Sequence, residues 1–183
     1  MKELLMKLYK ELNILEDKKL YNKINLFSIA ILIITTVAVL VAHTIIIGEV
    51  RLFFSLSTLV WVLGVTLVSL PIHEFIHGIF FKAFSTSGKV KYGFTKGMLY
   101  ATNPGQVYTK RQFMIIILAP FVINSILFCL LFIFGMDSTA FWIVFILHTA
   151  GCAGDFWYIY EIIKNPNITH CEDTPVGAKF FVA

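Results

Sequence analysis

The 183 residues of this chain are 58% hydrophobic and only 14% charged, and their mean hydropathy of +0.81 excludes a water-soluble globule, because too little polar surface is available to cover one. The net charge of +4 does not indicate nucleic acid as a partner, since the lysines and arginines fall where a membrane protein places its cytoplasmic loops. We therefore expect an all-α integral membrane protein, residues 1–183 forming one domain, with about four transmembrane helices in the lipid bilayer.

The predicted elements begin with an amphipathic helix over residues 1–23. Leucines at helical spacing stand there among six lysines, a pattern typical of a helix that lies on an anionic membrane surface. Residues 85–112, between the second and third spans, are polar and contain glycines and an Asn-Pro-Gly turn, which predicts a small cytoplasmic β-hairpin. The four predicted spans cover about residues 24–47, 52–84, 113–134 and 141–163.

The distribution of positive charge predicts how the spans are oriented. Six lysines precede the first span and six Lys/Arg residues lie between Lys82 and Arg111, whereas none lies in the turn between the third and fourth spans. By the positive-inside rule, both termini and the hairpin loop are cytoplasmic. We expect the protein in the plasma membrane, with the second and fourth spans each ending on the cytoplasmic side.

The segment from His73 to His77, of sequence HEFIH, lies near the end of the second span. Histidines four residues apart share one face of a helix, where their ring nitrogens converge on a single ion. In zincins such a pair binds Zn²⁺ and the carboxylate between them, here Glu74, acts as a general base. The alternative is two buried histidines bonded to neighbouring helices, with Glu74 paired or protonated. We favour the metal, because an uncompensated carboxylate in a membrane costs about 2.5–3.5 kcal/mol on insertion scales.

A catalytic zinc site needs a third protein ligand. Of the eleven acidic residues, only Glu74 and Asp155 lie well inside apolar spans, and the depths of His77 and Asp155 differ by about one helical turn. Asp155 is therefore the candidate third ligand. His148, on the same helical face, is a further ligand, a partner of a ligand, a proton relay or an interhelical hydrogen-bonding residue. Asn124 either supports a ligand or holds helices together.

At these residues the sequence resembles the family of putative membrane zincin peptidases of otherwise unknown function and, more distantly, the site-2 proteases that cut within membrane spans. The likeness covers residues 61–164, with HEFIH in a span, a β-prone loop, an Ala-Pro span and Gly-Asp in a last span. In such enzymes two histidines and a distant aspartate hold zinc while the motif glutamate is the base. The resemblance thus implies Zn²⁺ as cofactor, His73, His77 and Asp155 as its ligands and Glu74 as the catalytic residue.

The sequence therefore predicts a zinc-dependent intramembrane or membrane-interface metallopeptidase that hydrolyses peptide bonds of membrane-associated peptides or proteins. A helix hides its amides, so the substrate must unwind, and an edge strand in residues 88–101 could hold it extended. The alternative is a non-catalytic membrane protein that uses the same residues to handle metal or protons, or to assemble with a partner. The intramembrane carboxylates crowd toward the cytoplasmic end, which disfavours a path through the membrane.

Overall fold

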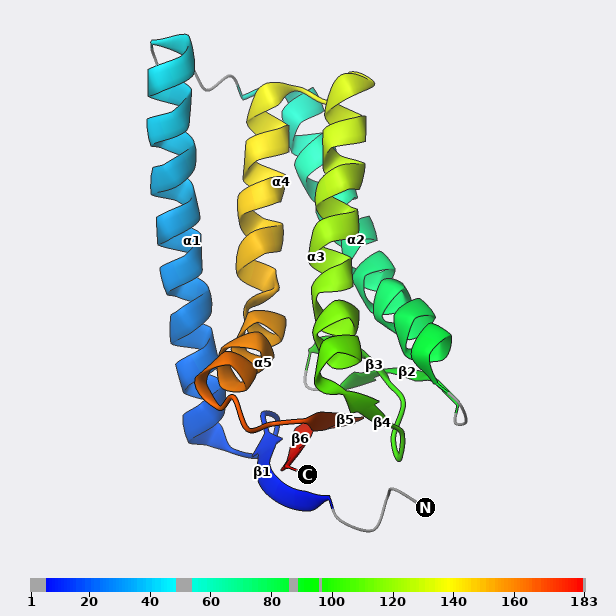
Figure 1. The fold of residues 1–183 in the computed structure, drawn as a ribbon. Coiled ribbons are helices and arrows are strands. Elements are labelled where there is room, and N and C mark those ends of the chain that lie inside the picture. Colours follow the sequence, from blue (N-terminus) through cyan, green and yellow to red (C-terminus); the bar gives the residue numbers. More distant parts are fainter. Residues whose placement is uncertain (1–5, 49–53, 86–88, 96, 183) are drawn as a thin grey trace.

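The structure is a computed structural model that describes residues 6–48, 54–85, 89–95 and 97–182. Within these residues, three helices are long and apolar enough to cross a membrane. Two shorter helices meet at a bend of 49°, and together they are long and apolar enough to form a fourth span. The helices lie side by side in Figure 1, with both chain termini at one end of the bundle. Their bounds are α1 (Lys18–Ile47), α2 (Leu56–Phe84), α3 (Lys110–Ile133), α4 (Ser138–Gly151) and α5 (Ala153–Lys164).

Polar capping residues determine where the helices begin. Asp17 caps α1 through a carboxylate that accepts two backbone N–H groups, and Asp137 caps α4 by accepting one. Ser55 and Thr109 begin capping boxes at α2 and α3. These caps satisfy amides that the first helical turn leaves without partners, so α1, α3 and α4 begin before the apolar runs that predicted them. The predicted start of the second span, residue 52, lies outside the described residues.

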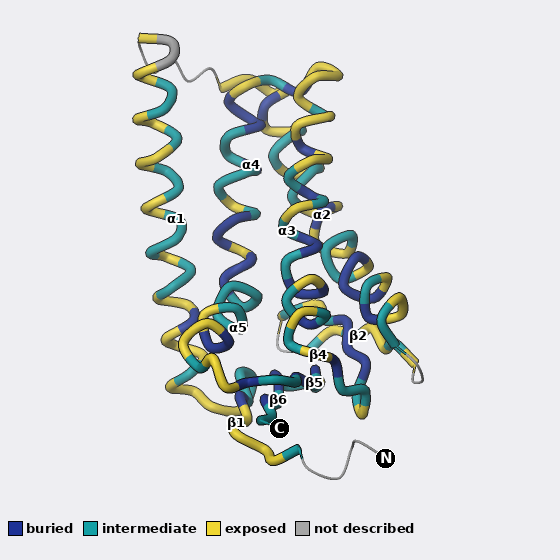
Figure 2. The backbone as a smooth tube through the Cα atoms, in the orientation of Figure 1, coloured by how far each residue is buried: buried dark blue, intermediate teal, exposed yellow. Residues whose placement is uncertain are grey.

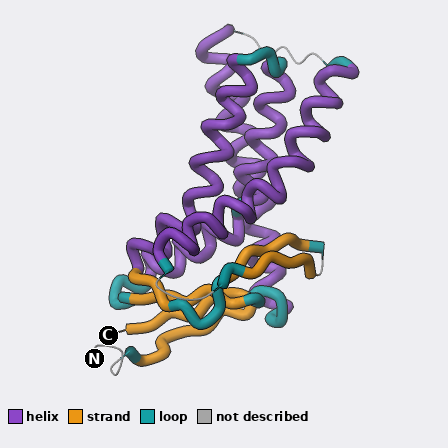
Figure 3. Tube along the Cα trace, turned by 90° about the vertical axis from the view of Figure 1, so that its right-hand side faces the viewer, coloured by secondary structure: helices purple, strands orange, loops and turns teal. Residues whose placement is uncertain are grey.

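The strands gather beneath the helices at the same end of the bundle (Figure 3). A hairpin of β2 (Lys91–Thr95) and β3 (Met98–Thr102) stands apart from the larger sheet. Its turn contains Gly97 at φ 83°, in the left-handed region that favours glycine. The hairpin predicted within residues 85–112 is therefore confirmed. The larger sheet is antiparallel, in the order β1 (Lys7–Asn13), β6 (Gly177–Val182), β5 (His170–Thr174) and β4 (Val107–Thr109).

Two parts of the predicted fold class are wrong. The four-stranded sheet means that the chain is not all-α, and residues 7–13 form a strand instead of part of an amphipathic helix over residues 1–23. Residues 1–5 of that segment lie outside the described residues. β1 pairs along its length with β6, at the other end of the chain. The local pattern of apolar residues therefore does not reveal that this segment is a strand. Of its leucines, Leu12 is buried, whereas Leu8 is 47% exposed.

An apolar core joins the sheet to the ends of the helices. Tyr108 of β4, Phe113 of α3 and Phe180 of β6 are fully buried in one cluster. The Tyr108 hydroxyl also donates a hydrogen bond to the carbonyl of Phe81 at 3.3 Å, which fastens β4 to α2. Farther from the sheet, large apolar residues along α1 and α2 are exposed, and Figure 2 colours many positions of both helices as exposed, as expected for helices that face lipid. The helices are consistent with a multi-pass membrane protein.

Candidate metal centre

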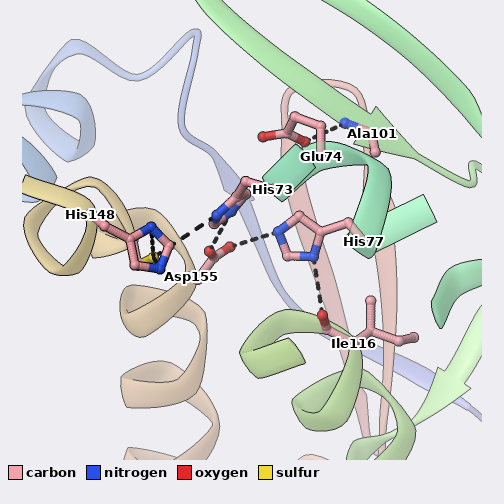
Figure 4. Close-up of polar contacts among 8 residues, drawn as sticks. His73, Glu74, His77, Ala101, Ile116, His148 and Asp155 are labelled. Carbon is pink, nitrogen blue, oxygen red and sulfur yellow. Dashed lines mark hydrogen bonds and ion pairs between the residues drawn. The ribbon is translucent and has the colours of Figure 1, made fainter. Parts of the chain in front are cut away.

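Three side chains that can bind a metal come together where α2 meets the start of α5 (Figure 4). The Nε2 atom of His73 lies 3.1 Å from Oδ2 of Asp155, and the Nε2 atom of His77 lies 3.4 Å from Oδ1. One nitrogen of each ring and one carboxylate oxygen all lie within 4.8 Å of one another. All three side chains are largely buried. The structure thus brings together the three residues predicted as ligands.

The spacing of these atoms fits a single zinc ion. Zn–N and Zn–O bonds of about 2.0–2.2 Å at tetrahedral angles place two ligand atoms roughly 3.3–3.6 Å apart. The distances of 3.1 and 3.4 Å between the imidazole nitrogens and the Asp155 oxygens come within a few tenths of an ångström of that range. Two imidazoles and one carboxylate also form a common ligand set of catalytic zinc sites.

The orientation of the His77 ring indicates that a proton or a metal ion lies between this ring and the Asp155 carboxylate. Its Nδ1 lies 3.0 Å from the carbonyl oxygen of Ile116, and because a carbonyl only accepts, this nitrogen must carry a hydrogen. In the neutral ring, Nε2 then presents a lone pair to the Asp155 carboxylate 3.4 Å away. Two acceptors at that separation repel each other unless a proton or a metal ion lies between them.

Glu74 lies beside this group and is held by the hairpin. Its Oε2 accepts the backbone N–H of Ala101 in β3 at 2.7 Å (Figure 4). A carboxylate fixed by a backbone amide keeps its position without a flexible partner side chain. Glu74 is therefore placed next to the metal-binding group on the same turn of α2, and β3 fixes its orientation. No sequence pattern points to Ala101, since the contact uses only its backbone N–H.

A break in the fourth span positions Asp155. The sequence predicted one helix over about residues 141–163, but α4 and α5 meet at a bend of 49°. Gly151 and Gly154 flank this bend, and glycine weakens a helix by about 1 kcal/mol relative to alanine. Asp155 lies in the first turn of α5, where its carboxylate contacts both histidines.

The N-terminal strand anchors the helix that carries Asp155. Lys10 of β1 forms an ion pair with Glu161 of α5 at 2.8 Å, and only 7% of the Glu161 side chain is exposed. The Tyr9 hydroxyl donates to Oδ1 of Asn165 at 2.8 Å, just beyond the end of α5. The sheet therefore contributes to the position of the candidate metal centre, although it supplies none of the three ligand candidates.

The candidate metal centre opens into a cavity of about 590 Å³ at the sheet end of the bundle. Three segments surround it besides the histidines: the β2–β3 hairpin, the turn between β5 and β6, and the beginning of α1. A cavity of this size, with an apolar lining and a few convergent polar groups, is typical of a ligand-binding site. Its position beside the strands places the metal-binding group near one end of the helices.

Asp173 of β5 also lines this cavity, and it is not among the site residues predicted from the sequence. The residue is 7% exposed, and its Oδ2 atom has no hydrogen-bond partner in the structure. Burial raises the pKa of Asp173 to about 8. No sequence pattern indicates that Asp173 is buried, because Cys171 is the only apolar residue among residues 170–174.

We expect Asp173→Asn to stabilise the metal-free protein at high pH. An unfolded aspartate titrates near pH 3.9, so between about pH 4 and 8 the folded chain keeps a proton that the unfolded chain has lost. The free energy of unfolding therefore falls as pH rises through this window, by at most about 1.4 kcal/mol per pH unit. Thermal unfolding is measured in detergent after chelation of metal. The stability of the variant relative to wild type should increase from pH 5 to pH 8. An identical pH dependence of both proteins would contradict this.

The structure separates the two residues whose roles the sequence left open. His148 lies beside His73, with ring centroids 6.0 Å apart, and outside the group that Asp155 completes. Asn124 is 1% exposed, and neither polar atom of its side chain has a hydrogen-bond partner. It lines a separate apolar cavity of about 530 Å³, formed by residues of α2 and α3.

Comparison with known protein families matches residues 66–169, more than half of the chain, to the family described as "Putative zincin peptidase". No curated protein and no solved structure matches the chain. The matched residues contain the HEFIH segment, the β2–β3 hairpin and Asp155, whereas Asp173 lies beyond them.

Proposed function

The chain belongs to the family of putative zincin peptidases, and from this premise we propose that it is a zinc-dependent metallopeptidase that hydrolyses membrane-associated peptides or proteins. The observation that carries the proposal is the convergence of His73 and His77 on one Asp155 carboxylate at 3.1 and 3.4 Å. The contact between His77 and Ile116 supports it, because it leaves the other ring nitrogen free to bind a metal.

The residues around the candidate metal centre have separate roles in this proposal. His73, His77 and Asp155 would hold a Zn²⁺ ion, which would supply Lewis-acid chemistry to a water molecule and to a peptide carbonyl. Glu74 accepts a proton from the attacking water and later returns it to the leaving amine. The amide of Ala101 holds the Glu74 carboxylate in place for both transfers. Burial of the group restricts competing water.

The open edge of β3 is the proposed place for the substrate backbone. In a strand, the amides of residues two apart point to the same side, and the N–H of Ala101 points to Glu74. The backbone groups of Leu99 therefore lie on that same edge, away from β2. A substrate segment that pairs there lies extended beside the general base, in the manner of β-strand addition. This satisfies the requirement that a helical substrate unwind before cleavage.

Metal analysis tests the proposed function directly. We expect about one Zn²⁺ per purified chain, lost in His77→Ala and bound at least tenfold more weakly in Asp155→Ala, because each change removes a ligand. His43→Ala is the matched control, since His43 lies on α1 outside the metal-binding group, and it should keep the metal. Full zinc affinity in both ligand variants would contradict the proposal and favour a membrane protein that uses these residues for assembly.

We further propose that the strands and both termini face the cytoplasm. Figure 1 places them together at one end of the bundle and the turn between α3 and α4 at the other, and the lysines and arginines favour the strand end. Single cysteines at Lys91 and Ser138, both exposed, should label from opposite sides of the membrane in a chain that lacks its native cysteines. We expect Lys91 to be the cytoplasmic site. Labelling of both from one side would contradict this topology.

A further inference from the structure

A second set of potential metal ligands lies directly beside the first. The sulfur of Cys152 is 4.0 Å from Nδ1 of His73, and 3.8 and 4.0 Å from the two ring nitrogens of His148. One atom from each of the three residues lies within 4.8 Å of the others. His148 and Cys152 are four residues apart at the end of α4, which is the spacing that puts two ligands on one helical face. Neither residue has a role in the proposed peptidase.

The distances are close to those that a metal ion needs. A Zn–S bond of about 2.3 Å and a Zn–N bond of about 2.0–2.1 Å at tetrahedral angles place sulfur and nitrogen roughly 3.6 Å apart. The separations of 3.8 and 4.0 Å from Cys152 exceed this value by only a few tenths of an ångström. Both ring nitrogens of His148 lie within 4.0 Å of the sulfur, so the ring already presents a nitrogen to such an ion. A thiolate with two imidazoles suits Zn²⁺ and other thiophilic ions.

The surroundings hold the group in place. Cys152 is 1% exposed, at the break between α4 and α5. The ring of His148 stacks on Phe121 with centroids 5.9 Å apart and meets Phe128 edge-on at 5.1 Å. Buried ligands in a fixed apolar surround lose little conformational entropy on binding.

His73 faces both sets of ligands. Its Nε2 lies 3.1 Å from Asp155, on the side of the first set, while its Nδ1 lies 4.0 Å from the Cys152 sulfur. A zinc-binding histidine usually donates its second N–H to a carboxylate, a carbonyl or water. In this structure the Cys152 thiol, a group that can bind a metal, lies on that side of the ring.

We propose that Cys152, His148 and Nδ1 of His73 form a second metal site for Zn²⁺ or another thiophilic divalent ion. On binding, the Cys152 thiol gives its proton to solvent. A neutral imidazole has one N–H and one lone pair, so an ion bound to Nδ1 of His73 leaves the hydrogen on Nε2, the nitrogen that the first site uses. Occupancy of the second site therefore weakens the first and inhibits the enzyme; the inhibition rests on the proposed peptidase function, whereas the binding does not.

Cadmium is the probe for this site, because a Cd²⁺–thiolate bond gives an ultraviolet charge-transfer band. We expect the full-length protein in detergent, loaded with one equivalent of zinc, to develop this band and to saturate at about one Cd²⁺ per chain. Cys152→Ala and the more conservative Cys152→Ser should lose the band, and His148→Ala should weaken Cd²⁺ binding at least tenfold. Cys129→Ala removes an exposed thiol and should leave the band unchanged. A wild-type protein without the band, or a band that survives loss of Cys152, would overturn the proposal.

Variants of the first metal site test the second site separately from the proposed peptidase function. His77 and Asp155 belong only to the first set of ligands, so His77→Ala and Asp155→Asn should keep the Cd²⁺–thiolate band. If these variants retain the band while the wild type shows no zinc at the first site, the peptidase proposal fails and the second site stands. If they lose zinc as expected and the wild type shows no thiolate band, the second site fails and the peptidase proposal stands.

Discussion

Glu74→Gln is expected to abolish peptide cleavage while leaving the metal bound. Glutamine keeps the shape of the side chain, and its carbonyl oxygen can still accept the N–H of Ala101, which donates to Glu74 at 2.7 Å. It has no basic carboxylate, so the attacking water loses its proton acceptor. Loss of a general base lowers the rate by about 10² to 10⁴. Zinc content should stay near one per chain, because Glu74 is outside the set of three ligand candidates.

The measurement compares wild type, Glu74→Gln and a control in which the exposed Glu16 becomes glutamine. Cleavage is followed with transmembrane peptides in vesicles and by comparing new protein termini in cells that express each variant. Glu16→Gln should match wild type in both assays. If Glu74→Gln lost zinc together with activity, Glu74 would be a ligand and not the base. If all three proteins gave the same cellular termini, the non-catalytic alternative would be favoured.

Gly177→Ala is expected to cause the largest loss of stability among single methyl additions at the sheet. A Cβ atom at Gly177 would lie 1.7 Å from the carbonyl oxygen of Leu12 and 2.8 Å from its carbonyl carbon. Both are backbone atoms of the paired strand β1, so no side-chain rotation relieves the clash. Overpacking typically costs about 1–3 kcal/mol, and this backbone clash should reach at least the upper end of that range. The expected result is a lower thermal midpoint and faster proteolysis at the lysines of β1.

Gly64→Ala is the control for this experiment, because nothing lies within 4 Å of a Cβ atom at that position and alanine favours a helix. It should be as stable as wild type or slightly more stable. The comparison also tests whether the N-terminal segment is a strand. If residues 7–13 were an amphipathic helix on the membrane surface, Gly177 would have no strand to clash with and both variants would behave alike.

The features that could be predicted from the sequence are those encoded by local patterns. Long apolar runs predict helices that are able to cross a membrane, because a bilayer requires about 20 apolar residues whatever the tertiary structure. The spacing of His73 and His77 fixes their common face because helical geometry does not depend on context. Asp155 could be linked to them because a carboxylate is rare within an apolar span. The structure brings these residues together, and their binding of zinc stays a prediction.

The features that could not be predicted depend on partners far away in the chain. β1 is a strand because Lys7 pairs with Val182 and Asn13 with Gly177, and no local pattern reports such a pairing. The buried position of Asp173 depends on the same sheet. The break at Cys152 was missed because glycines beside a helical run lower its stability without determining whether it bends. The juxtaposition of Cys152 with His73 follows from that break.

X-ray absorption at the zinc edge, on protein that carries one zinc per chain, tests whether His73, His77 and Asp155 bind the metal. The account predicts a first shell of nitrogen and oxygen only, with the scattering pattern of two imidazoles from His73 and His77 and one carboxylate from Asp155. Sulfur should enter the first shell only when a second equivalent of zinc is added. A zinc–sulfur distance of about 2.3 Å at one equivalent would contradict the account, because it would place the first ion on Cys152 instead of Asp155.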